Sequence, residues 1–211
     1  MKQIMLLAMM VFLVMACNLS DRFKRSETST SNKSSGTNSS SSDTAGGDEV
    51  TEKPNPTAAQ TAALANGQDV KWDEQGISWT LPASWKKESA STNSFQASGN
   101  GAFLIVSISA MSSDFPTEIS LKGFHEGAKV RKKNGEVDEL KWLELDGVRG
   151  VEFRESKTQM ADDIRRLQWM TYRKYANQTQ LVNFILSTSG GKFDNREDEL
   201  YAILYSTKLV H

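Results

Sequence analysis

Cysteine and histidine are almost absent from this chain of 211 residues, which has one cysteine, Cys17, and two histidines. A single cysteine cannot close an internal disulfide, and no cluster of Cys or His residues has the spacing of a metal site. No catalytic or nucleotide-binding motif stands out either. The sequence therefore predicts no metal, no cofactor and no catalytic residue, and burial of apolar side chains must stabilise the fold.

An excess of charge of one sign is also missing. The chain has 25 Lys+Arg and 26 Asp+Glu, and removal of residues 1–16 would take away only Lys2, which leaves 24 basic against 26 acidic residues. Such a balance gives no general attraction to nucleic acid or to acidic surfaces. We expect no nucleic-acid partner.

The longest apolar run is too short to cross a membrane. It extends over about 13 residues, from Ile4 to Ala16, whereas a spanning helix needs about 20. This length is typical of the hydrophobic core of a secretory signal peptide, here residues 1–16. The four residues Val14-Met15-Ala16-Cys17 resemble the bacterial lipobox. That resemblance implies cleavage before Cys17 and acylation of its thiol and its new amino group.

Two other interpretations of this segment stay open. Cys17 could be an incidental residue of an ordinary secretory signal, or the run could be an uncleaved anchor. All three interpretations place the rest of the chain outside the cytoplasm. Acylation also accounts for a lone cysteine in an oxidising compartment. We expect a lipid on Cys17 to hold the protein in the bacterial cell envelope, where it faces the periplasm or the cell exterior.

Residues 17–70 form a polar segment after this cysteine. Ser, Thr, Asn and Gly dominate it, and it has almost no large apolar side chain after Phe23. Such a composition buries too little surface to offset the entropy of the chain, so it predicts a disordered tether. A flexible tether of this length has a reach on the order of 40 Å. Within it, residues 57–65 could form a marginal helix between Pro56 and Asn66-Gly67.

Residues 71–211 carry the patterns of one α+β domain. An antiparallel sheet of about six to seven strands is expected, with helices packed on it. Asp146-Gly147 predicts a two-residue hairpin turn, and Asp194 with Glu197 predicts the capping box of a last helix. The segment 71–81 is expected to start with a turn at residues 74–76 and to continue as a half-buried strand through Ile77, Trp79 and Leu81. Further strands are expected at residues 94–98, 102–109, 140–145, 148–155, 164–175 and 179–189, and a first helix at residues 114–134.

The segment Gly76 to Trp85, GISWTLPASW, and the order of elements after it resemble the PsbP-like and DcrB-like group of α/β/α sandwich domains. The resemblance covers roughly Asp73 to Leu209. It implies a binding, assembly or envelope-associated module, a role that members of the group often fulfil as lipoproteins. It brings no catalytic residues, because the shared motif is a packing signature.

Four cations crowd the end of the first predicted helix: Lys129, Arg131, Lys132 and Lys133. They could form a patch that binds an anion or a lipid headgroup. Alternatively, they only complement the negative end of the helix dipole. Arg165-Arg166 and Arg173-Lys174, on one long strand, are equally consistent with a solvated face and with a basic groove.

Three further features bear on whether the domain has a catalytic or binding site. Trp142 falls on the opposite face of its strand from Leu143, so it could contact a partner or pack beneath a second layer of helix. His125 has no metal or catalytic partner in the sequence and is expected to be an ordinary helix-surface residue. The acidic pairs Asp162-Asp163 and Glu152 with Glu155 suggest no catalytic site, because the first lies in a polar loop and the second points to two faces.

These observations favour a non-enzymatic, membrane-anchored lipoprotein that binds or assembles an envelope component, with a protein as the expected partner. Two alternatives stay open. One is an envelope hydrolase with its site in the cleft between helix and sheet, which would need a pocket that collects His125 or several carboxylates. The other is a passive surface or stress lipoprotein.

Overall fold

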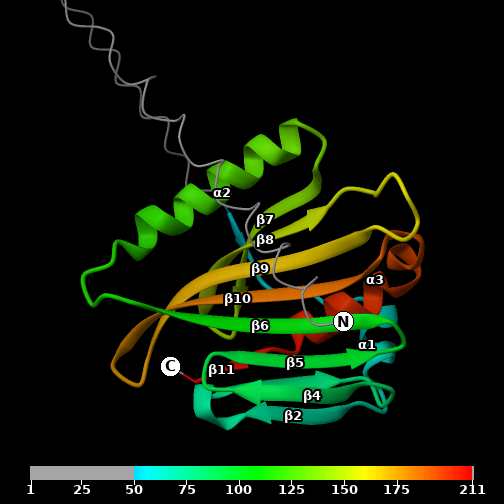
Figure 1. Cartoon of the computed structure of the whole chain (residues 1–211), viewed down its shortest axis with the longest axis horizontal. Coiled ribbons are helices and arrows are strands. Elements are labelled where there is room, and N and C mark those ends of the chain that lie inside the picture. The colour runs from blue at the N-terminus through cyan, green and yellow to red at the C-terminus, as the bar shows by residue number, and fades with distance from the viewer. Residues whose placement is uncertain (1–49, 211) are drawn as a thin grey trace, which may run out of the picture. The chain divides into compact units, whose positions relative to one another are not determined.

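The computed structural model describes residues 50–210, and its central element is an eight-stranded sheet (Figure 1). In spatial order its strands are β1 (Thr51–Glu52), β7 (Val137–Leu145), β8 (Val148–Glu155), β9 (Ile164–Tyr175), β10 (Gln178–Ser189), β6 (Ala102–Met111), β5 (Ser94–Gly99) and β4 (Lys86–Ser91). Neighbouring strands are antiparallel except β1, which pairs with β7 in parallel. The predicted α+β class is confirmed, although the strands exceed the expected six to seven.

A second, three-stranded sheet has the order β11-β3-β2. Its strands are β2 (Gln68–Trp72), β3 (Ile77–Leu81) and β11 (Lys208–Leu209), and the 3-10 turn η1 (Asp73–Gln75) joins the first two. The turn predicted at residues 74–76 and the alternating strand after it are confirmed, because the chain reverses at Gly76, whose positive φ of 57° suits glycine, and β3 follows. Strand β2, before the turn, was not predicted. Trp79 of β3 packs on Phe95 and Phe184, so the small sheet covers one face of the large one.

Two long helices lie on opposite faces of the large sheet. Helix α2 (Thr117–Lys133) packs on β7, β8 and β9, where it closes a small core with Trp142 and Phe153. Helix α3 (Gly190–Tyr205) shares the main core with the small sheet and with Trp169 of β9. Strand alternation explains this division, since neighbouring residues of one strand reach different helices. The expected helical layers are present on both faces.

The start of α3 corrects the prediction of a capping box at Asp194. The helix begins at Gly190, and Asp194 lies inside its first turns. The amides of Gly190 and Gly191 donate to the carbonyl oxygens of Asp163 and Ala161 at 2.7 and 2.9 Å. These bonds satisfy donors that would otherwise require a capping side chain.

The boundary predicted between tether and domain is also wrong. β1, helix α1 (Ala58–Ala63) and β2 all precede or overlap residue 70, yet they belong to the folded unit. Thr57 and Gln60 form a capping box at the start of α1, which supports the marginal helix expected there. Ordered backbone pairing thus begins about twenty residues earlier than composition indicated. The predicted signal peptide, Cys17 and the part of the predicted tether up to residue 49 lie outside the described residues.

The predicted hairpin turn at Asp146-Gly147 is confirmed. Both residues have positive φ, 48° and 84°, as a two-residue turn that matches strand twist requires. β6 is central in the sheet, between β10 and β5, as its apolar sequence indicated. However, Phe103 and Ile105 are 47% and 36% exposed, because α2 covers only the β7–β9 side of that face.

Gly150 of β8 gives a first prediction. A Cβ atom there would lie 2.5 Å from the Trp169 ring and 2.7 Å from the Met170 carbonyl oxygen. We expect Gly150→Ala to lower the free energy of unfolding by about 1–3 kcal/mol, because neither neighbour can move easily. Urea unfolding measures this change.

The matched control is Gly127→Ala on α2, where nothing lies within 4 Å of the added methyl group. That change should raise the free energy of unfolding by about 0.5–1 kcal/mol through helix propensity. Equal stabilities of the two variants would contradict the packing described for Trp169.

Candidate functional site

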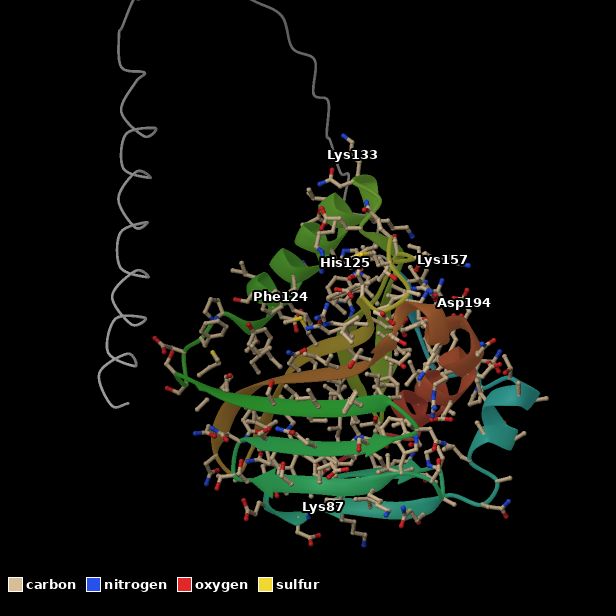
Figure 2. All side chains as sticks on the ribbon, turned by 45° about the vertical axis from the view of Figure 1, so that its right-hand side comes forward. Lys87, Phe124, His125, Lys133, Lys157 and Asp194 are labelled. Carbon is tan, nitrogen blue, oxygen red and sulfur yellow. The ribbon has the colours of Figure 1, made fainter. Side chains whose placement is uncertain are left out.

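A cleft of about 350 Å³ between α2 and β7 brings together three of the five predicted contact residues. Its lining includes Lys129, Lys132 and Trp142, together with His125, Leu140 and Glu52. Arg131 and Lys133 come from the same helix but do not line it. Figure 2 shows His125 directed from α2 toward the sheet and Lys133 at the far end of the helix. We call this hollow the α2–β7 cleft.

Trp142 forms the base of the α2–β7 cleft. Its ring stacks on that of His125 with centroids 4.5 Å apart, and the Arg149 guanidinium lies 3.9 Å from the Trp142 centroid. Both Trp142 and His125 are only 4% exposed. The interpretation of His125 as a surface residue is therefore wrong, because α2 turns this side toward the sheet. Of the two alternatives for Trp142, the structure shows packing beneath the helix, which leaves little of its ring for a partner.

The cations of α2 differ in their surroundings. Lys129 donates to Glu126 at 2.9 Å, and Arg131 reaches Glu136 and Glu155 at 3.3 and 3.4 Å. The Arg131 guanidinium also lies over the Phe153 ring at 5.1 Å. Arg131, Lys132 and Lys133 occupy the last turn of the helix, where cations complement its dipole.

A cluster of ionised groups fills the opposite face, between β7, β8 and α3. Glu152 is fully buried, and the Lys141 ammonium lies 3.5 Å from it and 3.1 Å from Glu139. The Tyr201 hydroxyl donates toward both glutamates, at 3.0 Å to Glu139 and 3.3 Å to Glu152. Burial raises the pKa of Glu152 to about 7, because Lys141 is shared between two carboxylates and only partly offsets desolvation.

The solvated-face interpretation of β9 holds for Arg166, which is 43% exposed, and for Lys174, but not for Arg165 and Arg173. Arg165 is 2% exposed and binds Asp138 and Asp194 at 2.6 and 2.7 Å. Arg173 is also buried; it donates to the Gln75 carbonyl oxygen at 2.6 Å, and burial lowers its pKa to about 10. Neither side chain belongs to a solvated face or to a basic groove. Their partners come from distant parts of the chain, which the strand pattern alone does not indicate.

Carboxylates of β7 and α3 line a common polar hollow of about 260 Å³. Its lining includes Glu139, Asp194 and Glu197. Each of these three is paired with a cation: Glu139 with Lys141, Asp194 with Arg165, and Glu197 with Arg154. His125 lies on the other face of the sheet, under α2. Asp198, the fourth carboxylate of the lining, is exposed and has no ion pair among residues 50–210. The hollow therefore collects several carboxylates but does not bring His125 to them.

The acidic pairs of the sequence behave as the strand pattern predicted. Glu152 contacts Lys141 on the α3 side, whereas Glu155 contacts Arg131 on the α2 side. Asp162 and Asp163 lie in the loop before β9. No group of three His, Cys, Asp or Glu side chains in residues 50–210 is arranged to hold a metal ion.

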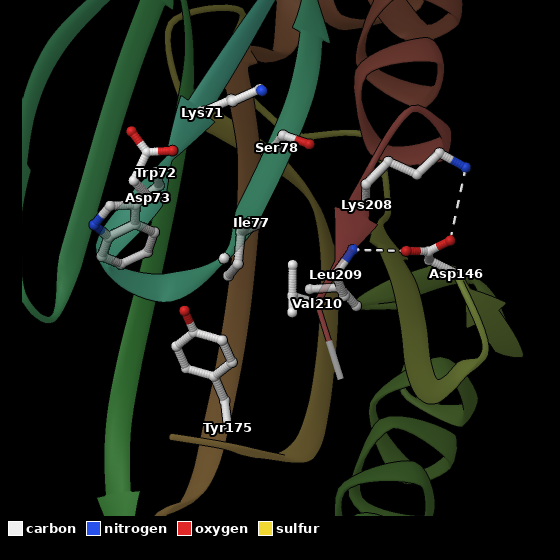
Figure 3. Close-up of a pocket in the computed structure, with 11 residues that line it drawn as sticks. Lys71, Trp72, Asp73, Ile77, Ser78, Asp146, Tyr175, Lys208, Leu209 and Val210 are labelled. Carbon is white, nitrogen blue, oxygen red and sulfur yellow. Dashed lines mark hydrogen bonds and ion pairs between the residues drawn. The ribbon is translucent and has the colours of Figure 1, made fainter.

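A larger hollow, of about 430 Å³, lies beside the small sheet (Figure 3). Trp72, Ile77 and Tyr175 form its apolar wall, and Asp146 accepts from the Leu209 amide at 2.8 Å and pairs with Lys208 at 3.7 Å. These contacts fix the last described strand to the β7–β8 turn. None of the predicted contact residues lines this hollow.

The exposed apolar face of β6 was not predicted. Phe103 and Ile105 point to the side that α2 leaves uncovered, where Ile105 pairs with Ile185 of β10. The sequence does contain a pattern that indicates this exposed face: Ser107 and Ser109 follow Phe103 and Ile105 with the same period of two. A face that mixes serine with large apolar residues is typically half solvated.

Among the helices in residues 50–210, none is both long and apolar enough to span a bilayer. Comparison of the sequence with known proteins finds no matching family model and no matching curated protein.

Several solved structures match the fold. LpqN of Mycobacterium tuberculosis, described as involved in cell envelope biogenesis, is 12% identical over 69% of this chain and 91% of its own, with a TM-score of 0.50. Cyanobacterial PsbP (CyanoP) from Synechocystis is 14% identical over 68% and 92%, with a TM-score of 0.44. The Ran-binding protein Mog1p of Saccharomyces cerevisiae is 10% identical over 69% and 96%, with a TM-score of 0.42. The likeness to LpqN concerns the fold alone, and nothing further is inferred from the two lower scores.

The buried Glu152 predicts a pH dependence of stability. Its folded pKa of about 7 lies above the value of 4.5 for an unperturbed glutamate, so the native state retains a proton that the unfolded state loses. The stabilisation is complete below pH 4.5 and is lost as the pH rises through 7, with a loss on the order of 3 kcal/mol.

The measurement is urea unfolding between pH 4 and pH 8 for the unmodified chain and for Glu152→Gln. The variant stays neutral, so its stability relative to the unmodified chain should increase with pH. Lys141, Glu139, Tyr201 and Arg154 face or adjoin this carboxyl group in both proteins, and their contributions largely cancel in the comparison. A pH-independent difference would contradict the raised pKa.

Proposed function

We propose that the protein is a lipid-anchored component of the bacterial envelope whose domain binds a protein partner without catalysis. The observation that carries the proposal is the uncovered face of the large sheet, where Phe103 and Ile105 stand exposed. Exposed aromatic and aliphatic residues on a rigid sheet are suited to act as anchors at an interface.

The ion pairing of the buried and half-buried acidic side chains supports a binding role over an enzymatic one. Of the four carboxylates that line the hollow beside α3, Glu139, Asp194 and Glu197 each have a cationic partner, and Asp198 alone has no ion pair among residues 50–210. Glu152 is enclosed by Lys141 and Tyr201. Paired groups of this kind fix the α3 layer on the sheet. A proton-transfer site would instead need an acid and a base facing a space where substrate can bind.

The lipobox-like residues before Cys17 support the anchor, and the folded unit now leaves residues 18–49 as the predicted tether. A flexible segment of that length would have a reach on the order of 30 Å. LpqN, which shares the fold, is described as involved in cell envelope biogenesis, and this agrees with an envelope location. The anchored domain would search a shell near the membrane for its partner.

Intact-mass analysis of the detergent-extracted protein tests the anchor. We expect the mass of a chain that begins at Cys17 and carries acyl groups, and we expect the protein in the membrane fraction. Cys17→Ser should lose both the acyl mass and the membrane association. An unacylated mature chain in the soluble fraction would show that the anchor is wrong.

Site-specific photo-crosslinking in the native envelope tests the partner. With a crosslinker at Gln96, which pairs with Ile105 across the β5–β6 ladder, we expect a discrete protein adduct. Phe103→Gln with Ile105→Gln should reduce this adduct at least about fivefold, because two interface anchors are lost. Both side chains are exposed, so the unfolding midpoint should change little.

The matched control is Ile119→Gln with Val130→Gln, which removes two exposed apolar residues from α2 instead. This variant should keep the adduct. Equal loss in both double variants, or a missing adduct under conditions that recover known envelope complexes, would contradict binding through the open sheet face.

A further inference from the structure

The α2–β7 cleft combines a cationic rim with a rigid aromatic base. His125, Lys129 and Lys132 follow each other at intervals of four and three residues, so they form one stripe along α2. His125 is buried against Trp142, and the two lysines continue the stripe toward solvent. Contacts with His125 and Arg149 hold the Trp142 ring in place.

The charges around the cleft leave its two helix lysines able to bind a ligand. Lys132 is exposed and takes part in no ion pair among residues 50–210. The pair between Lys129 and Glu126 joins side chains that are 42% and 66% exposed, so solvent screens it strongly. The third lysine of the lining, Lys141, pairs with Glu139 and Glu152 on the α3 side. It also lies 3.8 Å from Glu52, the one carboxylate of the cleft lining among residues 50–210, and so offsets that negative charge.

The dipole of α2 does not account for this arrangement. The last turn holds Arg131, Lys132 and Lys133, whereas Lys129 lies before it. Cations that only complement the helix dipole can point in any direction around the helix axis. Only Lys129 and Lys132 of the four cations turn to the cleft, and they share it with the Trp142 base.

We propose that the α2–β7 cleft binds a phosphate group, with the ammonium groups of Lys129 and Lys132 as its ligands. Lysine binds phosphate as a point charge, whereas planar carboxylates are preferentially held by the arginine fork, which the lining lacks. The volume of about 350 Å³ accommodates a phosphate and the polar group that carries it. This inference names a second ligand for the proposed binding module and does not depend on the lipid at Cys17.

The test compares two double variants of the full chain that have the same net charge. Lys129→Ala with Lys132→Ala removes the cleft lysines, and Lys122→Ala with Lys133→Ala removes two exposed lysines of α2 outside the cleft. Each protein is titrated with inorganic phosphate at constant ionic strength and followed by calorimetry. We expect the cleft variant to bind about tenfold more weakly than the unmodified chain, and the control variant to bind within about twofold of it.

Equal weakening in both variants, or an unmodified chain that does not bind phosphate, would overturn the site. Both double variants should unfold at the same urea concentration as the unmodified chain. A cleft variant that does unfold early is replaced by Lys132→Ala against Lys133→Ala, since these exposed neighbours differ only in their position at the cleft.

Two sources of phosphate are separated by a second arm. Vesicles of phosphatidylglycerol and of phosphatidylcholine are mixed with both double variants. The N-terminal segments of the two variants are identical, so their contribution to vesicle binding is the same in both. Where the cleft variant binds inorganic phosphate more weakly than the control variant, weaker binding to phosphatidylglycerol vesicles as well would identify a lipid headgroup. Equal binding of the two variants to those vesicles would identify a soluble phosphate ester. Phe103, Ile105 and Cys17 are unchanged in both double variants. If the two variants bind phosphate equally while crosslinking and acylation are retained, the phosphate site is overturned and the proposed function stands.

Discussion

Alternation of side chains along β7, β8 and β9 is the constraint on which the rest of the structure depends. Lys141 points toward α3 and Trp142 toward α2, although they are consecutive. A shift of one residue in the pairing of β7 with β8 would place the ammonium under α2 and the indole among the ionised groups of the α3 side. The hairpin turn at Asp146-Gly147 fixes this register, and thereby assigns ionised groups to one helix and the aromatic stack to the other.

The two faces of the sheet serve different purposes because of this division. On the α3 side, opposite charges neutralise one another in a largely enclosed space, and the buried Arg165 connects β9 to both Asp138 and Asp194. Breaking such a buried set leaves uncompensated charge, so it stabilises one arrangement of helix and sheet. The α2 side remains accessible along the cleft and over β6. Binding to partners is therefore expected from the α2 side, and structural rigidity from the α3 side.

Local patterns predicted those elements whose signals lie within a few residues. The hairpin at Asp146-Gly147, helix α2 and the long strands β9 and β10 follow from turn chemistry and periodicity. The patterns failed where a distant segment completes an element. β1 exists because β7 offers it an edge, and α3 begins at Gly190 because the loop carbonyls of Asp163 and Ala161 accept its first amides. Composition over 17–70 could not reveal the first contact, and the local pattern at Asp194 could not reveal the second.

The amino-acid order, taken alone, gives the class of the fold, the alternation of each strand and the cationic end of α2. It also contains the lipobox-like residues at Cys17, which lie outside the described part of the chain. The three-dimensional packing decides which polar groups are buried and with which partners. Asp138 beside Arg165, Tyr201 beside Glu152 and Trp142 beside His125 are all distant in sequence from the residue they contact. A strand pattern predicts that two consecutive residues lie on opposite faces of the sheet. Which of the two faces is buried depends on the helices and the small sheet that cover it.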